Sequence, residues 1–143
     1  MKREPALAVL SRDHHQALAV ALKLRRATAD TAAEARDAFL GFWESDGHHH
    51  FRVEEQVLLP AFAAFGDAHH PLVARALCEH VVIRHRADVL ARERTASPER
   101  LHELGAMLAD HVRLEERELF GLIEDVLPAP ELAALAAALE EAG

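Results

Sequence analysis

The stretch HFRVEEQVLL (residues 50–59) recurs later in the chain as HVRLEERELF (residues 111–120). Both copies fit the pattern H-x-R-[VL]-E-E-[QR]-x-L, and their apolar residues have helical spacing. Because side chains four positions apart lie on one face of an α-helix, each copy places a histidine beside a glutamate. These pairs are His50 with Glu54 and His111 with Glu115. The repeat therefore predicts two related helices that carry similar polar groups on an apolar face.

The rest of the chain predicts further helices around this repeat. Alanine, leucine, glutamate and arginine dominate, while glycine and proline fall mostly between periodic segments. We expect long helices at about 5–28, 31–65, 71–94 and from 98 to just before Pro128, with a short fifth helix from Pro130. This all-α pattern is typical of an up-down-up-down four-helix bundle. In such a bundle the second and fourth helices run in the same direction, so their repeats can face each other across the core.

Proline and serine mark several of the expected helix ends. Pro71 suits the first turn of the third helix, and Ser97 with Pro98 suits the cap and first turn of the fourth. Pro60 is expected to kink the last turns of the second helix. The second helix should end near Gly66 and Asp67.

Composition narrows the class of protein. The 143 residues suit a single domain (1–143), and half of them are apolar, which is enough for a sizeable core. A formal charge of -8 argues against nucleic acid and anionic membranes as partners. The single cysteine, Cys78, excludes an internal disulfide and suits a reducing compartment. The first residues resemble no targeting or membrane segment, so we expect a cytoplasmic protein, either monomer or homodimer.

Helical-wheel directions separate the 11 histidines into inward and outward groups. Six titratable residues lie within the apolar faces of the four long helices: His14, His50, Glu54, His80, His111 and Glu115. The remaining histidines lie off these faces and are expected at the surface or at helix caps: His15, His48, His49, His69, His70, His85 and His102. Glu55 and Glu116 also point away from the faces. Cys78 also points away from the apolar faces, and we expect its small side chain to be buried or half-buried. Trp43 is expected in the core or in the wall of a cavity.

Buried imidazoles and carboxylates on facing helices are typical of a metal site. A carboxylate buried without a partner is costly, so it pairs, becomes protonated or binds a cation. Nitrogen and oxygen donors suit iron, manganese or zinc. The alternative is a purely structural set of buried His–Glu pairs, with salt bridges from arginines: Arg52, Arg84 and Arg113.

The donor count favours two metal ions. Four histidines supply nitrogen donors, and two bridging glutamates supply four oxygen bonds. An oxo or hydroxo bridge adds two more, whereas two octahedral ions need about twelve bonds in all. About two positions then stay open for dioxygen, nitric oxide, peroxide or water.

With these residues, the chain resembles the hemerythrin-like (HHE cation-binding) family over nearly its whole length. The family's motifs match Asp13-His14, His50 to Glu54-Glu55, Glu79-His80 and His111 to Glu115-Glu116. The resemblance implies a four-helix bundle that holds a non-haem di-iron centre. It also implies the ligands: His14, His50, Glu54, His80, His111 and Glu115.

One position departs from the oxygen-carrying hemerythrins, which have a second histidine on the third helix where this chain has Arg84. Arginine cannot serve as a ligand. The remaining set is more similar to the di-iron domain of bacterial iron-cluster repair proteins, so reversible oxygen carriage is less expected. For Arg84 we expect a salt bridge, ahead of orienting Glu54 or Glu115 or attracting an anionic ligand. Glu118 is expected to accept a histidine N–H, ahead of being a seventh ligand.

Three functions fit these residues. The first is a binding or sensing protein for a small diatomic ligand, dioxygen or nitric oxide, at the metal pair. The second is an iron-cluster repair factor, an iron donor, or an enzyme that reduces nitric oxide or peroxide. The third is iron storage or a structural metal site. The third function is ranked last because one metal pair per chain stores little iron and because inward carboxylates indicate a reactive metal. The first two functions are close in rank, and whether the protein is an enzyme stays open.

Overall fold

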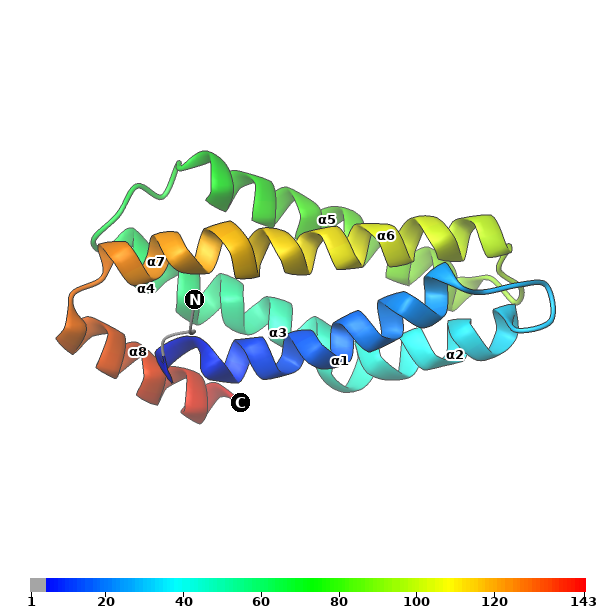
Figure 1. Cartoon of the computed structure of the whole chain (residues 1–143), viewed down its shortest axis with the longest axis horizontal. Helices are drawn as coiled ribbons and strands as arrows, with labels where there is room; N and C mark the ends of the chain where they lie inside the picture. Colours follow the sequence, from blue (N-terminus) through cyan, green and yellow to red (C-terminus); the bar gives the residue numbers. More distant parts are fainter. Residues whose placement is uncertain (1–4) are drawn as a thin grey trace.

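The computed structural model describes residues 5–143, and all regular structure in this range is helical. Four antiparallel rods form the bundle (Figure 1). The first rod is η1 (Pro5–Leu7) with α1 (Ala8–Arg25), and the third is α5 (Pro71–Arg92). The second and fourth rods are built from several consecutive elements. These are α2 (Ala32–Phe42), η2 (Trp43–Gly47), α3 (His48–Val53), η3 (Glu54–Leu58) and α4 (Leu59–Ala63), then α6 (Pro98–Leu114), η4 (Glu115–Leu119) and α7 (Phe120–Val126). The all-α bundle predicted from the sequence is confirmed.

The second and fourth rods contain π-helical turns that the apolar pattern did not predict. The segment η3 begins at Glu54 and η4 begins at Glu115, while η2 is a third such turn. A π-turn adds one residue to a helical turn without ending the helix, so periodicity over a long segment hardly changes. Pro60 is in α4, directly after η3, where the wide turn ends. Two of the three π-turns therefore begin at the inward-facing glutamates.

The helix starts follow the expected capping residues. Ser97 Oγ accepts a hydrogen bond from the Arg100 N–H at 3.2 Å, with Pro98 in the first turn of α6. His70 Nδ1 accepts from the Leu72 N–H at 3.1 Å, with Pro71 in the first turn of α5. These caps satisfy N–H groups that have no partner within the helix.

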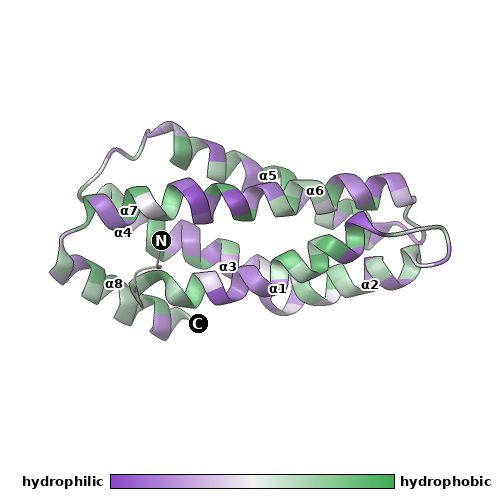
Figure 2. Ribbon diagram, viewed as in Figure 1, coloured by the Kyte–Doolittle hydropathy of each residue, from purple (hydrophilic) through white to green (hydrophobic). Residues whose placement is uncertain are grey.

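A fifth helix, α8 (Ala129–Ala142), crosses one end of the bundle and packs beside η1 (Figure 1). Its start agrees with the proline signal at Pro130, although the helix runs on to the end of the chain. Near its end, His49 Nε2 donates to the Ala142 carbonyl at 2.9 Å. Hydrophobic residues predominate along α8, whereas α1, α5 and α6 show alternating hydrophobic and hydrophilic bands (Figure 2). Leu135 and Leu139 bury the inner face of α8.

Two apolar clusters occupy opposite parts of the bundle. The first, called here the α1–α6 core, includes Leu24, Phe39, Leu101, Leu104 and Leu108. The second, called here the α8 core, joins η1, η3, α4, α7 and α8 through residues such as Leu7, Leu58, Phe62, Ile123 and Leu139. The buried polar residues recorded in the described range are the six predicted ligands. The bundle is thus apolar at both ends.

Three large apolar residues that continue the apolar pattern of their helices are nevertheless exposed. Leu18 and Leu77 are each 38% exposed, and Phe65 is 49% exposed. Leu18 and Leu77 lie at the borders of their helical stripes, while Phe65 follows the end of α4 at Ala63. Cys78, expected to be buried or half-buried, is also exposed. A helical wheel predicts direction but not how far a neighbouring helix extends over a border position.

No helix among residues 5–143 is both long enough and apolar enough to cross a membrane.

Candidate metal centre

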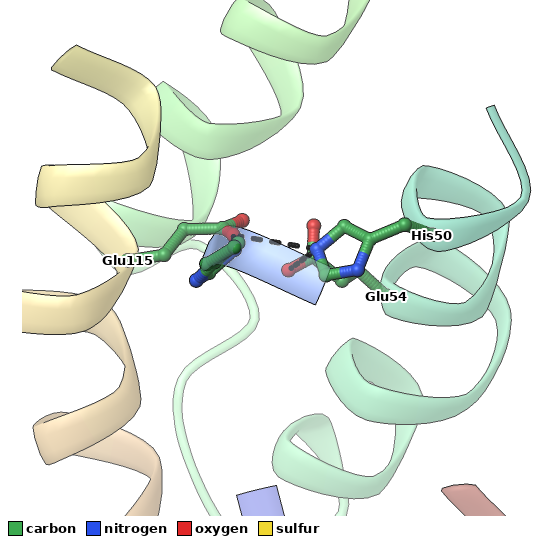
Figure 3. A group of neighbouring side chains, drawn as sticks. His50, Glu54 and Glu115 are labelled. Atoms are coloured by element: carbon green, nitrogen blue, oxygen red, sulfur yellow. Dashed lines mark hydrogen bonds and ion pairs between the residues drawn. The ribbon is translucent and has the colours of Figure 1, made fainter. Parts of the chain in front are cut away.

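All six predicted ligands point into the bundle, and none is more than 7% exposed. His14 comes from α1, His50 from α3, His80 from α5 and His111 from α6, while Glu54 begins η3 and Glu115 begins η4. Figure 3 shows His50 and Glu54 directed towards Glu115 from the opposite side of the bundle. The structure therefore brings together every side chain that the helical wheels placed inside.

The six residues form two groups that share both glutamates. One consists of His14, His50, Glu54 and Glu115, and the other of Glu54, His80, His111 and Glu115. Within each group, one possible ligand atom per residue lies within 4.8 Å of all the others. Two cations could therefore be held side by side.

The two oxygens of each shared glutamate face different groups. Glu54 Oε2 lies 3.1 Å from His50 Nε2, and Glu54 Oε1 lies 3.0 Å from His80 Nε2. Likewise, Glu115 Oε1 lies 2.9 Å from His14 Nε2, and Oε2 lies 3.1 Å from His111 Nε2. A carboxylate that divides its oxygens in this way has the arrangement of a bridging ligand.

Each inward histidine also contacts an outer carboxylate through its other ring nitrogen. The Nδ1 to oxygen distances are 2.7 Å for His14 with Glu116 and 2.9 Å for His50 with Asp13. They are 2.7 Å for His80 with Glu55 and 2.8 Å for His111 with Glu79. We assign the proton to Nδ1 from this network, so that Nδ1–H donates and the Nε2 lone pair faces inwards. Such contacts orient metal-binding histidines and strengthen them as donors.

The four outer carboxylates connect the bundle helices in a closed ring. Each is the sequence neighbour of an inner residue, yet it accepts from a histidine on a different helix: Asp13, Glu55, Glu79 and Glu116. The wheels placed Glu55 and Glu116 off the inward faces and did not assign them to the centre, yet both contact its histidines. The prediction for Glu118 was wrong, because Glu118 is exposed and makes no hydrogen bond with a described histidine. The signal for the outer carboxylates was their position next to an inner ligand.

The charge state of the centre depends strongly on its burial. Burial alone would lower the pKa of His80, but hydrogen bonds to Glu115 and Glu54 and their charges raise it to about 9. Burial likewise opposes protonation of His111, while the charge of Glu115 and hydrogen bonds to Glu115 and Glu79 raise its pKa to about 10. Burial would raise the pKa of Glu115, yet His111 and the other histidines hold it well below its usual range. Protons thus compensate the buried carboxylates when no metal does.

Several buried atoms have the pattern expected of donors for a cation. His50 Nε2 and both Glu54 oxygens are buried and lack a hydrogen bond, although they lie close to each other. His80 Nε2 and His111 Nε2 are only 3.1 Å apart, and both carry lone pairs when their Nδ1 atoms donate. A proton or a cation must relieve this contact. The donors therefore fit a pair of metal ions held by nitrogen and oxygen.

Arginine side chains do not form the salt bridges to the inner carboxylates that the purely structural alternative includes. Arg84 Nη2 donates to both oxygens of Glu55 at 3.1 and 3.0 Å, which confirms the predicted salt bridge and gives its partner. Arg113 pairs with Asp110, and Arg52 is exposed. Among residues 5–143, no arginine forms an ion pair with Glu54 or Glu115. The inner carboxylates therefore depend on histidines or a cation for compensation.

A small cavity adjoins three of the histidines: His14, His50 and His111. Its other walls are mostly apolar and include Phe42, Trp43, Phe51, Leu108 and Val112. About 10 Å³ is free for the centre of a water-sized molecule, roughly the room for one such molecule. Trp43 is therefore a cavity-lining residue, as predicted. Asp13 and Asp46 also contribute to the lining.

The histidines predicted to be outside the centre are not part of it. Six of the seven are exposed: His15, His48, His49, His69, His85 and His102. The seventh, His70, is half-buried and caps α5. The local run from His48 to His50 thus contributes a single residue to the centre.

The comparisons with known proteins agree with this geometry. A model of the hemerythrin HHE cation-binding domain matches residues 6–123, which include all six inner residues and all four outer carboxylates. The chain belongs to this family. No curated protein and no solved structure gives a match. Membership of the hemerythrin HHE family and the two buried groups together indicate a domain that binds metal cations.

Proposed function

We propose that this hemerythrin-like domain holds two iron ions and binds dioxygen or nitric oxide at them. The proposal depends on the positions of the Glu54 and Glu115 oxygens. In each glutamate, one oxygen faces a histidine of one pair and the other oxygen faces a histidine of the other pair. Family membership supports iron, since nitrogen and carboxylate oxygen donors suit it. Zinc and manganese, which the same donors accept, are the alternatives for the metal test.

The protein's own residues have separable tasks in this proposal. Four histidines and two glutamates would hold the ions, while the outer carboxylates keep each imidazole in one tautomer and orientation. When bound, a reduced iron pair supplies redox-active positions that accept a diatomic ligand. The aromatic residues of the cavity, Phe42, Trp43 and Phe51, exclude bulk water beside three of the histidines.

The cavity favours a small ligand over a larger substrate. Its free volume suits one molecule of about the size of water, and its walls are mainly apolar. Dioxygen and nitric oxide are neutral and small, so entry costs them little desolvation. The burial of all six ligands also makes iron donation or storage the less favoured function, because release would require the centre to open.

The decisive experiment combines metal analysis with spectroscopy on protein purified without a histidine tag. We expect two irons per chain after anaerobic reconstitution and a change in the visible spectrum on adding dioxygen or nitric oxide. Fewer than two metals per chain would contradict the paired site. Catalytic loss of nitric oxide or peroxide, with turnover in the presence of a reductant, would favour the reducing enzyme instead. Transfer of iron to an acceptor protein would favour the repair factor.

A further inference from the structure

The π-turn η2 (Trp43–Gly47) contains none of the six inner residues. It lies in the middle of the second rod, and the backbone N–H of His48 donates to the Trp43 carbonyl across it. Gly47 ends the turn with a φ of -62°, an ordinary helical value, so the backbone itself does not require glycine there. Glycine weakens a helix interior relative to alanine. The reason for a buried glycine at this position therefore lies in its surroundings.

Two aromatic rings occupy the space that a side chain on residue 47 would fill. A Cβ on Gly47 would lie 2.9 Å from Phe42 Cε2 and 2.9 Å from Trp43 Cε3. Because a π-turn has about one more residue than an α-helical turn, it places residue 47 between the directions of residues 42 and 43. The absence of a side chain thus lets both rings pack directly against the backbone of η2.

The rings are held by aromatic neighbours on their other sides. Trp43 stacks on Phe39, with ring centroids 6.2 Å apart and planes 11° apart, and meets Phe51 edge-on with centroids 5.3 Å apart. Phe42 contacts the same Phe39 ring at 6.3 Å, and Phe39 is fully buried. The free space that Gly47 and both rings border is the small cavity beside the histidines. A methyl group on residue 47 would therefore push the rings into this cavity.

The cavity lies between the solvent and the metal centre. Three of its lining residues are not buried, namely Asp13, Trp43 and Asp46, so its entry lies between α1 and η2. Further in, its walls include Leu108 and Val112, each 2% exposed. The free volume of about 10 Å³ holds one small molecule, and a single methyl group is enough to fill it. Access through this cavity thus depends on how far the aromatic rings extend into it.

We propose that Gly47 is a positioning residue that sets the access of neutral diatomic molecules to the centre, because it lets Phe42 and Trp43 pack back from the cavity. The inference rests on the proposed function and adds to it an entry route and the residue that controls its width. Dioxygen and nitric oxide carry no charge, so the carboxylates of Asp13 and Asp46 at the entry do not repel them. The same carboxylates oppose the approach of small anions.

The test follows dioxygen inside the metal-free full chain by NMR under oxygen pressure, through the paramagnetic relaxation of methyl protons. In the unaltered protein we expect strong relaxation at the buried methyl groups of Leu108 and Val112. Leu101 is equally buried but is not among the lining residues, so its methyl groups give the reference. Gly47→Ala should reduce the relaxation at the cavity methyl groups by about tenfold, because the rings then overpack the space.

Gly41→Ala is the matched control, since Gly41 lies on the same rod and a Cβ there would meet nothing within 4 Å. It should leave the relaxation unchanged. If Gly47→Ala does not fold, the same change is made together with Phe42→Leu, which removes the ring atoms nearest to the new methyl group. The double variant should then show less dioxygen contact than Phe42→Leu alone.

The iron-loaded protein gives a second measurement. Nitric oxide should change its visible spectrum more slowly in Gly47→Ala, with the same iron content and the same final spectrum. Unchanged or greater dioxygen contact in Gly47→Ala would overturn the inference and leave the proposed function intact, and so would an unaltered protein without contact at Leu108 and Val112. If dioxygen enters as expected but the iron-loaded protein binds neither gas, the proposed function is wrong, and the role of Gly47 in ligand access is wrong with it.

Discussion

The α1–α6 core and the metal centre are built on the same helices but by opposite interactions. In the α1–α6 core, α1 and α6 approach so closely that a Cβ on Gly105 would lie 2.8 Å from the Ala21 carbonyl oxygen. The centre instead buries two carboxylates and four imidazoles, and within each of its two groups the possible ligand atoms lie within 4.8 Å of one another. Each fully buried leucine of the core contributes roughly 1.5–3 kcal/mol, whereas buried charges cost free energy unless they are compensated. The comparison shows that the apolar clusters at its two ends stabilise the bundle. Their burial offsets the free-energy cost of the polar centre.

The largest expected effect comes from removing a shared glutamate. Changing Glu54 or Glu115 to alanine removes two of the oxygens that face both histidine groups, so paired metal binding should be lost. Metal analysis and the visible spectrum of the reconstituted variants measure the effect. His15→Ala is the control, because His15 is exposed and adjoins His14 in sequence only. A bridged spectrum that survives either glutamate change would disprove the ligand assignment.

The next effect is a steep dependence of metal affinity on pH. His80 and His111, with pKa values raised to about 9 and about 10, carry protons at neutral pH in the metal-free protein. A metal binds only neutral imidazole, so binding must release these protons. Releasing two protons makes affinity rise by up to about 100-fold per pH unit below pH 9. Calorimetric titration with Co²⁺ in buffers of different ionisation enthalpy counts the protons, and a count of zero would contradict this charge state.

The same pKa shifts predict the opposite trend for the stability of the metal-free protein. Both histidines have folded-state pKa values above their ordinary value of 6.5, so their contribution is fully present below that pH. It is lost as the pH rises through about 9 to 10. Denaturant unfolding of the metal-free chain should therefore show a falling free energy between pH 6.5 and pH 10, and the metal-loaded protein should not follow it. A flat profile for the metal-free chain would argue against protonated histidines.

A smaller effect is expected from an outer carboxylate. Asp13→Asn keeps the size of the side chain but removes the charge that accepts from His50 Nδ1. Loss of such a partner weakens metal binding by about 10–100-fold. Competition with a chelator measures the affinity, and Arg12→Ala is the control because Arg12 is exposed and pairs with Glu140. Equal metal affinities for Asp13→Asn and the unaltered protein would show that the outer carboxylates do not contribute to metal binding.

The smallest effect separates the core from the centre. Gly105→Ala should lower the free energy of unfolding by about 1–3 kcal/mol, because α1 and α6 must move apart. Metal content should stay unchanged. Gly121→Ala is the matched control, since nothing lies within 4 Å of a Cβ at that position, and alanine there should stabilise α7 by up to about 1 kcal/mol. If Gly105→Ala emptied the metal centre, the two regions would not be independent.

Periodicity was enough to predict the helices and the inner residues because both depend on direction along a single helix. His14, His50, His80 and His111 each lie on an apolar stripe, with Glu54 and Glu115 one turn after two of them. Burial of a histidine or glutamate on such a stripe is costly enough to stand out from the surrounding pattern. Leu18, Leu77 and Phe65 show the limit of the method, because their exposure depends on where the neighbouring helices end.

The sequence by itself determined the all-α bundle, the family and the six residues that face its interior. Only the tertiary structure decided that Asp13, Glu55, Glu79 and Glu116 support histidines on other helices, and that Arg84 acts on Glu55. The π-turns at Glu54 and Glu115 also appeared only in the structure. The physical reason is that one helix sets the direction of its own side chains, whereas a contact between helices depends on their separation, rotation and relative height.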